Sequence, residues 1–504
     1  MSRFNLVTEK WIPVRFLDGT REELGISAVL LRAKRIASIE DASPLVVAAL
    51  HRFLLAVLYR ALGGPTDIDQ AKSLFKTGFP KEKIETYLGK WYDWFWLFDE
   101  KYPFGQNPHV SSDRIEPWTK LTAEYNATTR RVLFDHTDTR AAGERTPAEC
   151  ARWLIATLNF SIAGGSGLYP SPSPNAIMCI PEGDNLQRTL CYCLIPENRE
   201  IVKSDRPIWE RKPKALPLNK PKRSSAGYTD LFTWQSRMIL LEESESGLVG
   251  SMRFIAGEGF ENPSANPDPM QAYRADPKRG RMPVQFRTDR GTWRDFDSLL
   301  PDEERLAPLT MHNVLDLAGN RAADLPKAVL VLGLRYSPPN ANLDFWRMER
   351  FVLPLTLAQD RSIRNAIHTL LDWAEVSQHA LWSSCRAYAR HLLSRGDRDP
   401  DKKDIKAFLD QMMPLPMYWS MLESRFHEIL EKFSGARSSI QIQKQWLQSI
   451  HGALRKSWES HRASVSTADA WAIRAVVMAE LPVQRRLNEL DREIEELRLD
   501  EEVT

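Results

Sequence analysis

The sequence predicts an α+β fold, in which a large mixed N-terminal domain over residues 1–354 precedes a C-terminal four-helix bundle over residues 355–504. The chain of 504 residues exceeds the size at which one hydrophobic core stops growing, so a second domain is expected. Only 3 of the 24 glycines and 4 of the 32 prolines lie beyond residue 354. Because both residues disfavour helix interiors, the last 150 residues are predicted to be nearly all helix.

The first element is predicted to be a strand. Residues 6–14 read Leu-Val-Thr-Glu-Lys-Trp-Ile-Pro-Val, and the Asp-Gly pair at 18–19 indicates a turn behind them, so a hairpin is expected here.

A helix is predicted next, over residues 45–62. Ser43 supplies a capping side chain, Pro44 fits the first helical position, and the Gly-Gly-Pro at 63–65 ends the apolar run. The stretch is apolar enough to resemble a membrane span, but histidine and arginine side chains interrupt it at 51, 52 and 60. We therefore interpret it as a buried amphipathic helix and expect no membrane partner.

Residues 100–354 are rich in turn-forming residues between short apolar runs such as 190–195 and 328–334, which indicates mixed strands, helices and long loops.

The C-terminal part shows four apolar runs at helical spacing, which favour an antiparallel four-helix bundle. The runs are Ile367, Leu370, Leu371 and Ala374; Trp419, Leu422, Phe426, Ile429, Leu430 and Phe433; Ile442, Trp446, Leu447, Ile450 and Leu454; and Trp471, Ala475, Val476 and Ala479, continued by Leu487, Leu490 and Ile494.

Bulk composition is that of a globular protein with no global electrostatic signature, since 68 Lys and Arg stand against 66 Asp and Glu. The first residues lack the pattern of an export signal, and the five cysteines have irregular spacing with no Cys-x-x-Cys pair. We therefore expect reduced thiols, a cytoplasmic location and no zinc ribbon.

Common catalytic motifs are missing from the sequence: it has no phosphate-binding P-loop, no dinucleotide fingerprint, no nucleophile elbow and no His-Glu-x-x-His. One candidate catalytic or metal site is the tetrad Asp135-His136-Thr137-Asp138. Adjacent residues project in different directions and do not converge on one ion, so a metal-dependent nuclease is kept only as an alternative to a non-enzymatic role.

Three stretches indicate a nucleic-acid partner. Residues 203–223 carry eight basic residues and residues 274–294 carry seven, each against two acids. Such loops neutralise phosphates, although a solvated basic loop is an equally good reading of each alone. The third is Gly164-Gly165-Ser166-Gly167, whose bare backbone could approach a partner or simply form a flexible turn.

Several segments, in order, resemble the CasA proteins, the large subunit of the type I-E CRISPR surveillance complex called Cascade. The first, at residues 4–15, is Phe-Asn-Leu-Val-Thr-Glu-Lys-Trp-Ile-Pro-Val-Arg; the others are Ser43-Pro44-Leu45, Tyr102-Pro103-Phe104-Gly105-Gln106, Pro117-Trp118-Thr119-Lys120-Leu121, Phe232-Thr233-Trp234-Gln235 and the helical last third. The resemblance covers essentially the whole chain. It implies a non-catalytic subunit that recognises the protospacer-adjacent motif in double-stranded DNA, helps to open the target for guide RNA pairing, and recruits the helicase-nuclease.

The resemblance also implies roles for particular residues. A glycine loop at Gly164, Gly165 and Gly167 would read the minor groove, a basic finger would be supplied by Arg274 or else Lys278, and a polar wedge would come from the stretch with Asn340 and Asn342, where Asn342 matches the wedge position. The loop at Phe134, Asp135 and His136 would contact the guide RNA or neighbouring Cascade subunits. Arg485 and Arg486 would touch a DNA strand, with a solvated helix face as an equal alternative. Some members hold zinc through paired cysteines near that loop; this chain has a lone Cys150 there, so we expect no metal and no cofactor.

Two other readings remain open at this point. One is the metal-dependent nuclease centred on the Asp135-His136 loop. The other is a purely structural scaffold that assembles without affecting DNA affinity.

Overall fold

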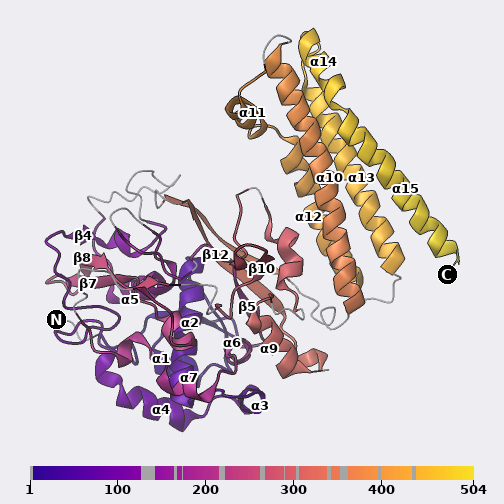
Figure 1. Ribbon diagram of the computed structural model, residues 1–504. Coiled ribbons are helices and arrows are strands. Elements are labelled where there is room, and N and C mark those ends of the chain that lie inside the picture. The colour runs from indigo at the N-terminus through magenta and orange to yellow at the C-terminus, as the bar shows by residue number, and fades with distance from the viewer. Residues whose placement is uncertain are drawn as a thin grey trace. The chain divides into compact units, whose positions relative to one another are not determined.

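The computed structural model describes residues 4–125, 142–163, 167–172, 174–214, 222–261, 267–288, 290–301, 306–319, 321–337, 342–351, 361–395, 399–433 and 439–503. The chain divides into two compact units. Unit 1 comprises Met1–Thr288 and Ser298–Leu353, and unit 2 comprises Asp289–Asp297 and Pro354–Thr504. The predicted α+β class is confirmed, because the strands lie in unit 1 and unit 2 is helical in its described part (Figure 1).

Unit 1 combines several small sheets with helices. Its described strands form the sheets β2-β1-β3, β13-β12-β5, β4-β8-β7, β10-β11 and β6-β9. The strands are β1 Ile12–Phe16, β2 Arg21–Leu24, β3 Ile36–Ile39, β4 Glu116–Pro117, β5 Met178–Glu182, β6 Lys222–Arg223, β7 Arg237–Glu243, β8 Val249–Ala256, β9 Gly259–Phe260, β10 Tyr273–Asp276, β11 Gly280–Pro283, β12 Ala328–Ser337 and β13 Asn342–Phe351. The α-helices are α1 Ile26–Leu31, α2 Pro44–Leu62, α3 Ile68–Thr77, α4 Lys81–Lys90, α5 Pro147–Phe160, α6 Leu186–Cys193, α7 Arg199–Ser204, α8 Tyr228–Phe232 and α9 Leu309–Ala318.

Helix α2 is the central element of unit 1. Its predicted ends are confirmed, because the Ser43 side chain accepts a hydrogen bond from the Val46 amide and Gly63 closes the helix with φ of 68°. The helix packs against α4, α5, α8 and β12 and is buried on all sides over most of its length, so its expected amphipathic character is wrong. It is also the one described helix long and apolar enough to cross a membrane, and 83% of that window lies inside the protein.

The predicted N-terminal hairpin is present but starts later than expected. Strand β1 begins at Ile12 and pairs antiparallel with β2, and Gly19 occupies the turn with φ of 89°. The preceding residues instead form a turn in which the buried Trp11 indole donates to the Leu6 carbonyl over 2.8 Å. The first half of the expected strand is therefore a turn, which places the Trp11 indole in the core of unit 1.

The sheet β13-β12-β5 supports the candidate site. Its central strand β12 is buried almost continuously and pairs antiparallel with both neighbours. Gly333, in the middle of β12, has φ of 155°, and a Cβ there would lie 2.9 Å from the Ala176 carbonyl oxygen. The close approach of the chain just before β5 and the positive φ both favour glycine at this position.

Unit 2 contains, among its described residues, the long helices α10 Arg361–Ser394, α12 Pro414–Phe433, α13 Ser439–Ser464 and α15 Leu481–Val503, with the shorter α11 Lys402–Leu409 and α14 Ala470–Ala479. The long helices pack side by side as a bundle (Figure 1), and most residues of the predicted apolar runs are buried in it, while Trp419, Trp471 and Ile494 stay partly exposed. The fourth run is not one helix, because the chain breaks between α14 and α15. Pro482 lacks the N–H that a continuous helix would need there.

A short segment from before the bundle belongs to unit 2. Trp293 is 2% exposed and packs against Trp419, Phe426 and Trp446, with ring centroids 4.9 to 6.5 Å apart. Arg294 lies over the Trp419 ring at 3.5 Å. The stretch 289–297 is therefore anchored on the bundle by an aromatic side chain rather than continuing the N-terminal unit.

Candidate nucleic-acid interface

The strands β10 and β11 form an antiparallel hairpin, which we call the basic hairpin (residues 273–283). Arg274 and Lys278 are both exposed on it, together with Arg279 and Arg281. The Asp276 carboxylate accepts hydrogen bonds from the backbone amides of Lys278 and Arg279, at 2.9 and 2.8 Å, and these bonds lower its pKa. Asp276 stays ionised, but four cations stand against this one acid, so the hairpin carries a net positive charge.

Buried contacts fix the root of the basic hairpin. Its first strand follows Asp268, whose carboxylate forms a buried ion pair with Arg52 of α2. The Val284 amide donates to the Ala272 carbonyl and the Ile177 amide to the Val284 carbonyl, at 2.8 and 2.9 Å. The base of the hairpin is therefore hydrogen-bonded to the chain just before β5 and is joined to α2 by the buried ion pair.

The predicted glycine loop lies between two clamped flanks. Gly164 and Gly165 fall outside the described residues, and Gly167 is exposed in a turn with φ of 80°. Ser161 precedes these glycines and Ser171 follows them, and two hydrogen bonds join the pair. The Ser171 amide donates to the Ser161 carbonyl over 2.8 Å, and the Ser161 amide donates to the Ser171 hydroxyl over 3.0 Å. Positive φ at Gly167 is a conformation that favours glycine.

Arg237 of β7 holds the same two flanks together. Its guanidinium donates to the Ile162 carbonyl over 2.6 Å and also to the Tyr169 carbonyl. Burial lowers the pKa of Arg237 to about 10, so the group is still a cation at neutral pH. Arg237 and the Ser161–Ser171 hydrogen bonds therefore connect the chain before the glycine loop to the chain after it.

The end of β12 brings the glycine loop and the basic hairpin to one place. The Asn175 side chain accepts from the Tyr336 amide over 2.9 Å and donates to the Tyr336 carbonyl over 3.3 Å. Arg335 donates to Gln285, just past the hairpin, over 2.9 Å. Two segments distant in sequence, at Asn175 and at Gln285, are therefore tied to the last residues of one strand.

The strand that carries the expected wedge leaves this same end of β12. Asn342 is the first residue of β13 and pairs with Ser337, while Asn340 falls outside the described residues. We call the glycine-loop flanks, the basic hairpin and this β12–β13 end the β12 cluster. The expected guide-RNA contacts Phe134, Asp135 and His136 lie outside the described residues.

The two arginines expected to touch a DNA strand occupy different positions on α15. Arg485 is exposed, and it forms no ion pair with any of the described side chains. Arg486 is 6% exposed and donates to Ser377 of α10 and to Glu489 and Glu493 of its own helix, at 2.8 to 3.1 Å. This inward orientation corrects the expectation for Arg486, since its donors are used inside the bundle.

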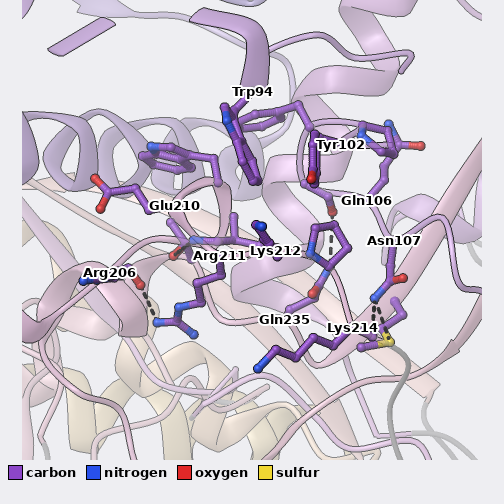
Figure 2. A pocket seen from close by; sticks show the side chains of 18 of the residues that line it. Trp94, Tyr102, Gln106, Asn107, Arg206, Glu210, Arg211, Lys212, Lys214 and Gln235 are labelled. Carbon is purple, nitrogen blue, oxygen red and sulfur yellow. Dashed lines mark hydrogen bonds between the residues drawn. The ribbon is translucent and has the colours of Figure 1, made fainter. Parts of the chain in front are cut away.

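The basic stretch 203–223 contributes to a cavity that the sequence did not reveal. The cavity has a volume of about 580 Å³ and lies in unit 1 between this stretch and the Tyr-Pro-Phe-Gly-Gln segment at 102–106. Figure 2 shows the rings of Trp94 and Tyr102 next to one another, with Arg211 and Lys214 facing them across the space. We call this cavity the aromatic pocket. The sequence analysis had noted both the segment 102–106 and the basic stretch 203–223, but only the fold brings the two together.

The five cysteines are free, buried thiols, as expected. Burial raises the pKa of Cys150, Cys191 and Cys385 to about 12, so they are protonated and unreactive at neutral pH. Within the described ranges, which leave out residues 126–141, His, Cys, Asp and Glu side chains nowhere gather in a group of three or more that could hold a metal.

Known proteins resemble this chain along nearly all of its length. The family described as CRISPR-associated protein Cse1 matches residues 5–457. A Thermus thermophilus protein named CRISPR-associated protein CasA/Cse1 is 30% identical over 512 aligned positions, covering 98% of this chain and 99% of its own. The structure of Thermus thermophilus CasA (Cse1) matches with a TM-score of 0.82 at 27% identity, over 97% of this chain and 100% of its own.

More distant structures share the fold. Cse1 from Acidimicrobium ferrooxidans has a TM-score of 0.74 at 23% identity, covering 98% of this chain and 99% of its own. A chain of a CRISPR RNA-guided surveillance complex has a TM-score of 0.76 at 17% identity, covering 97% of this chain and 100% of its own.

Proposed function

The chain belongs to the CRISPR-associated Cse1 (CasA) family, and from that premise we propose that it is the large, non-catalytic subunit of a type I-E Cascade surveillance complex. In this role it recognises the protospacer-adjacent motif in duplex DNA through the minor groove, helps to open the target for guide RNA pairing and recruits the helicase-nuclease. Its partners are the other Cascade subunits, the guide CRISPR RNA and the target duplex, in the cytoplasm.

The observation that carries the proposal is the β12 cluster. Asn175, which follows the glycine loop, and Gln285, which follows the basic hairpin, bind Tyr336 and Arg335 at the end of β12, and the wedge strand β13 begins opposite Ser337. A scaffold with no DNA contact gives no reason to bring a positive hairpin and a glycine turn to the same strand end. A duplex minor groove does give one, because its floor carries acceptors and its edges carry phosphates.

Each part of the cluster has a distinct task in the proposal. The glycine backbone at 164–167 approaches the base edges, where a side chain would collide, and the basic hairpin neutralises phosphates or enters the groove. The wedge at Asn342 inserts at the first target base pair. Opening one base step costs about a few kcal/mol, which protein contacts and heteroduplex pairing must offset.

Other contacts in the proposal lie away from the cluster. Phe134, Asp135 and His136 meet the guide RNA or a neighbouring subunit. Arg485 contacts a DNA strand; Arg486 is withdrawn from this role because its guanidinium is used within the bundle.

The test is motif-dependent DNA capture by the assembled complex. The chain is combined with its partner subunits and a guide RNA, and binding to a duplex with the correct motif is compared with binding to one whose motif is scrambled. Gly165→Trp should abolish capture of the correct duplex while the complex still assembles, because an indole would fill the space that the groove needs.

Gly89→Trp is the matched control, because Gly89 is exposed, has no positive φ, and a Cβ there meets nothing within 4 Å. It should capture DNA like the unmodified chain. Unchanged capture by Gly165→Trp would favour the scaffold reading, and DNA cleavage by the isolated chain with a divalent metal, lost in His136→Ala, would favour the nuclease.

A further inference from the structure

We propose that the aromatic pocket is a second nucleic-acid site, which binds one unpaired nucleotide of a single strand through its base and phosphate. The inference goes beyond the proposed function, because no residue of the pocket belongs to the β12 cluster. Its volume of about 580 Å³ falls in the range of about 300–1,000 Å³ that is usual for small-ligand sites. A duplex is too large for such a space, whereas one unstacked base with its phosphate is not.

One wall of the pocket offers a surface for stacking. The Trp94 and Tyr102 rings are stacked with centroids 4.2 Å apart and an interplanar angle of 24°. Trp91 packs edge-on against Trp94 at 5.7 Å, which holds the pair in place. Both stacked side chains remain partly exposed, and both line the cavity. Preformed aromatic faces of this kind bind unstacked bases of any sequence.

The facing wall is positively charged. Arg206, Lys212 and Lys214 are exposed and line the cavity, and no acidic side chain of the described residues lies within ion-pair distance of them. Arg211, beside them, is paired with Asp230 at 2.6 Å. Three uncompensated cations around one cavity favour an anionic ligand.

The acids that line the pocket are already neutralised. Glu210 accepts two hydrogen bonds from Arg60, at 2.8 and 2.7 Å, and one from the Tyr87 hydroxyl at 2.8 Å. Glu258 accepts from Arg223 over 2.8 Å. These carboxylates therefore do not cancel the charge of the three cations.

The side-chain amide of Asn107 holds the basic wall in position. The Asn107 side chain donates to the Lys214 carbonyl over 3.0 Å, and its own oxygen accepts from the His109 amide over 2.9 Å. Gln235 donates to the Gly105 carbonyl over 3.3 Å, which leaves its side-chain oxygen as an acceptor beside the cavity (Figure 2). A base amino group is a suitable donor for that oxygen. The pocket thus combines stacking, a polar acceptor and phosphate-binding charge.

The experiment uses the full chain and a fluorescein-labelled octa-adenylate, with dissociation constants measured by anisotropy at ~50 mM and ~200 mM salt. Lys212→Ala/Lys214→Ala should weaken binding at the lower salt about tenfold and lower the salt slope by about 0.7 for each phosphate that the variant no longer neutralises. Tyr102→Leu should weaken binding by a similar factor with the slope unchanged, because stacking carries no counterion release, and Tyr102→Phe should restore it.

Lys402→Ala/Lys403→Ala, an adjacent exposed pair in unit 2, is the matched control and should bind like the unmodified chain. Unchanged affinity in the Lys212/Lys214 variant would overturn the site, and so would adenosine monophosphate binding as tightly as the octamer, since that would identify a free nucleotide as the ligand. Motif-dependent duplex capture by the complex should survive in the pocket variants, and octamer binding should survive in Gly165→Trp, so each proposal fails separately.

Discussion

The Nη1 atom of Arg52 lies 2.6 Å from the Oδ2 atom of Asp268, and the two side chains are only 2% and 5% exposed. Arg52 comes from the middle of α2, where its guanidinium also lies 4.6 Å over the Phe232 ring. The other carboxylate oxygen of Asp268 accepts from the Met270 amide over 2.9 Å, and its own amide donates to the Tyr273 hydroxyl over 2.7 Å. One buried pair therefore joins the core helix to the root of the basic hairpin.

Asp268→Asn should destabilise the protein strongly. The amide keeps the size of the carboxyl group but leaves the charge of Arg52 buried without a counter-ion. Breaking a buried pair in this way usually costs about 3–5 kcal/mol, which urea unfolding of the chain would measure as a lower midpoint with an unchanged slope.

The exposed pair Lys81–Glu85 supplies the control for that experiment, since its side chains are 70% and 48% exposed. Glu85→Gln should change the free energy of unfolding by less than about 1 kcal/mol. A loss below about 1 kcal/mol for Asp268→Asn as well would mean that the buried pair is not what fixes the hairpin root.

The basic hairpin should contribute to DNA affinity mainly through counterion release. Arg274→Ala and Lys278→Ala should each reduce the salt slope of duplex binding by the assembled complex by about 0.9 if each cation meets one phosphate. Binding isotherms at several salt concentrations give the slope. Lys76→Ala, an exposed lysine at the end of α3, is the comparison, and a hairpin variant that matches it would place these cations away from the DNA.

Substitutions of Arg485 and Arg486 should have different effects, one on DNA binding and the other on the free energy of unfolding. Arg485→Ala should weaken DNA binding without affecting unfolding, because the side chain is exposed. Arg486→Ala should lower the free energy of unfolding by about 1.5–3 kcal/mol, since it removes charged hydrogen bonds to Ser377 and Glu493. Thermal or urea unfolding beside a DNA-binding assay would distinguish the two, and the reverse pattern would contradict these assignments.

Local signals in the sequence were sufficient where neighbours along the chain decide the structure. The start of α2 at Ser43 and its end at Gly63 follow from capping chemistry that acts over a few residues. The break at Pro482 carried a signal of the same kind, but the apolar spacing on both sides of it suggested one continuous helix. The amphipathic prediction for α2 failed because burial on every face depends on what packs around the helix.

Contacts between distant residues could not be read from the sequence. Nothing local in the sequence marks Trp293 as an anchor on α12 and α13, nor places Tyr102 and Lys214 on opposite walls of one pocket. Glycine content and basic charge marked the glycine loop and the basic hairpin in the sequence, and the family resemblance supplied their expected roles, but their shared attachment to β12 emerged only from the fold. The inward position of Arg486 likewise depends on its hydrogen bond to Ser377 of α10, which is distant in the sequence.

His51 should make the stability of the protein depend on pH. Its ring is 3% exposed in α2, with Nδ1 2.8 Å from the Val47 carbonyl oxygen, and burial lowers its pKa from 6.5 to about 4. Between these values the unfolded chain binds a proton that the folded chain excludes. The free energy of unfolding must therefore fall as the pH falls from 6.5 towards 4, by up to about 1.4 kcal/mol per pH unit from this residue alone.

His51→Leu removes this titration, so its free energy of unfolding should fall less steeply than that of the unmodified chain over the same pH window. Urea unfolding at half-unit pH intervals gives both curves, and other groups that titrate in both proteins cancel in their difference. His51→Asn should run parallel to His51→Leu even though its packing differs, because neither side chain binds a proton in this range. If the curves of the unmodified chain and both variants were parallel, the His51 ring would have to be reached by water or already protonated in the folded protein.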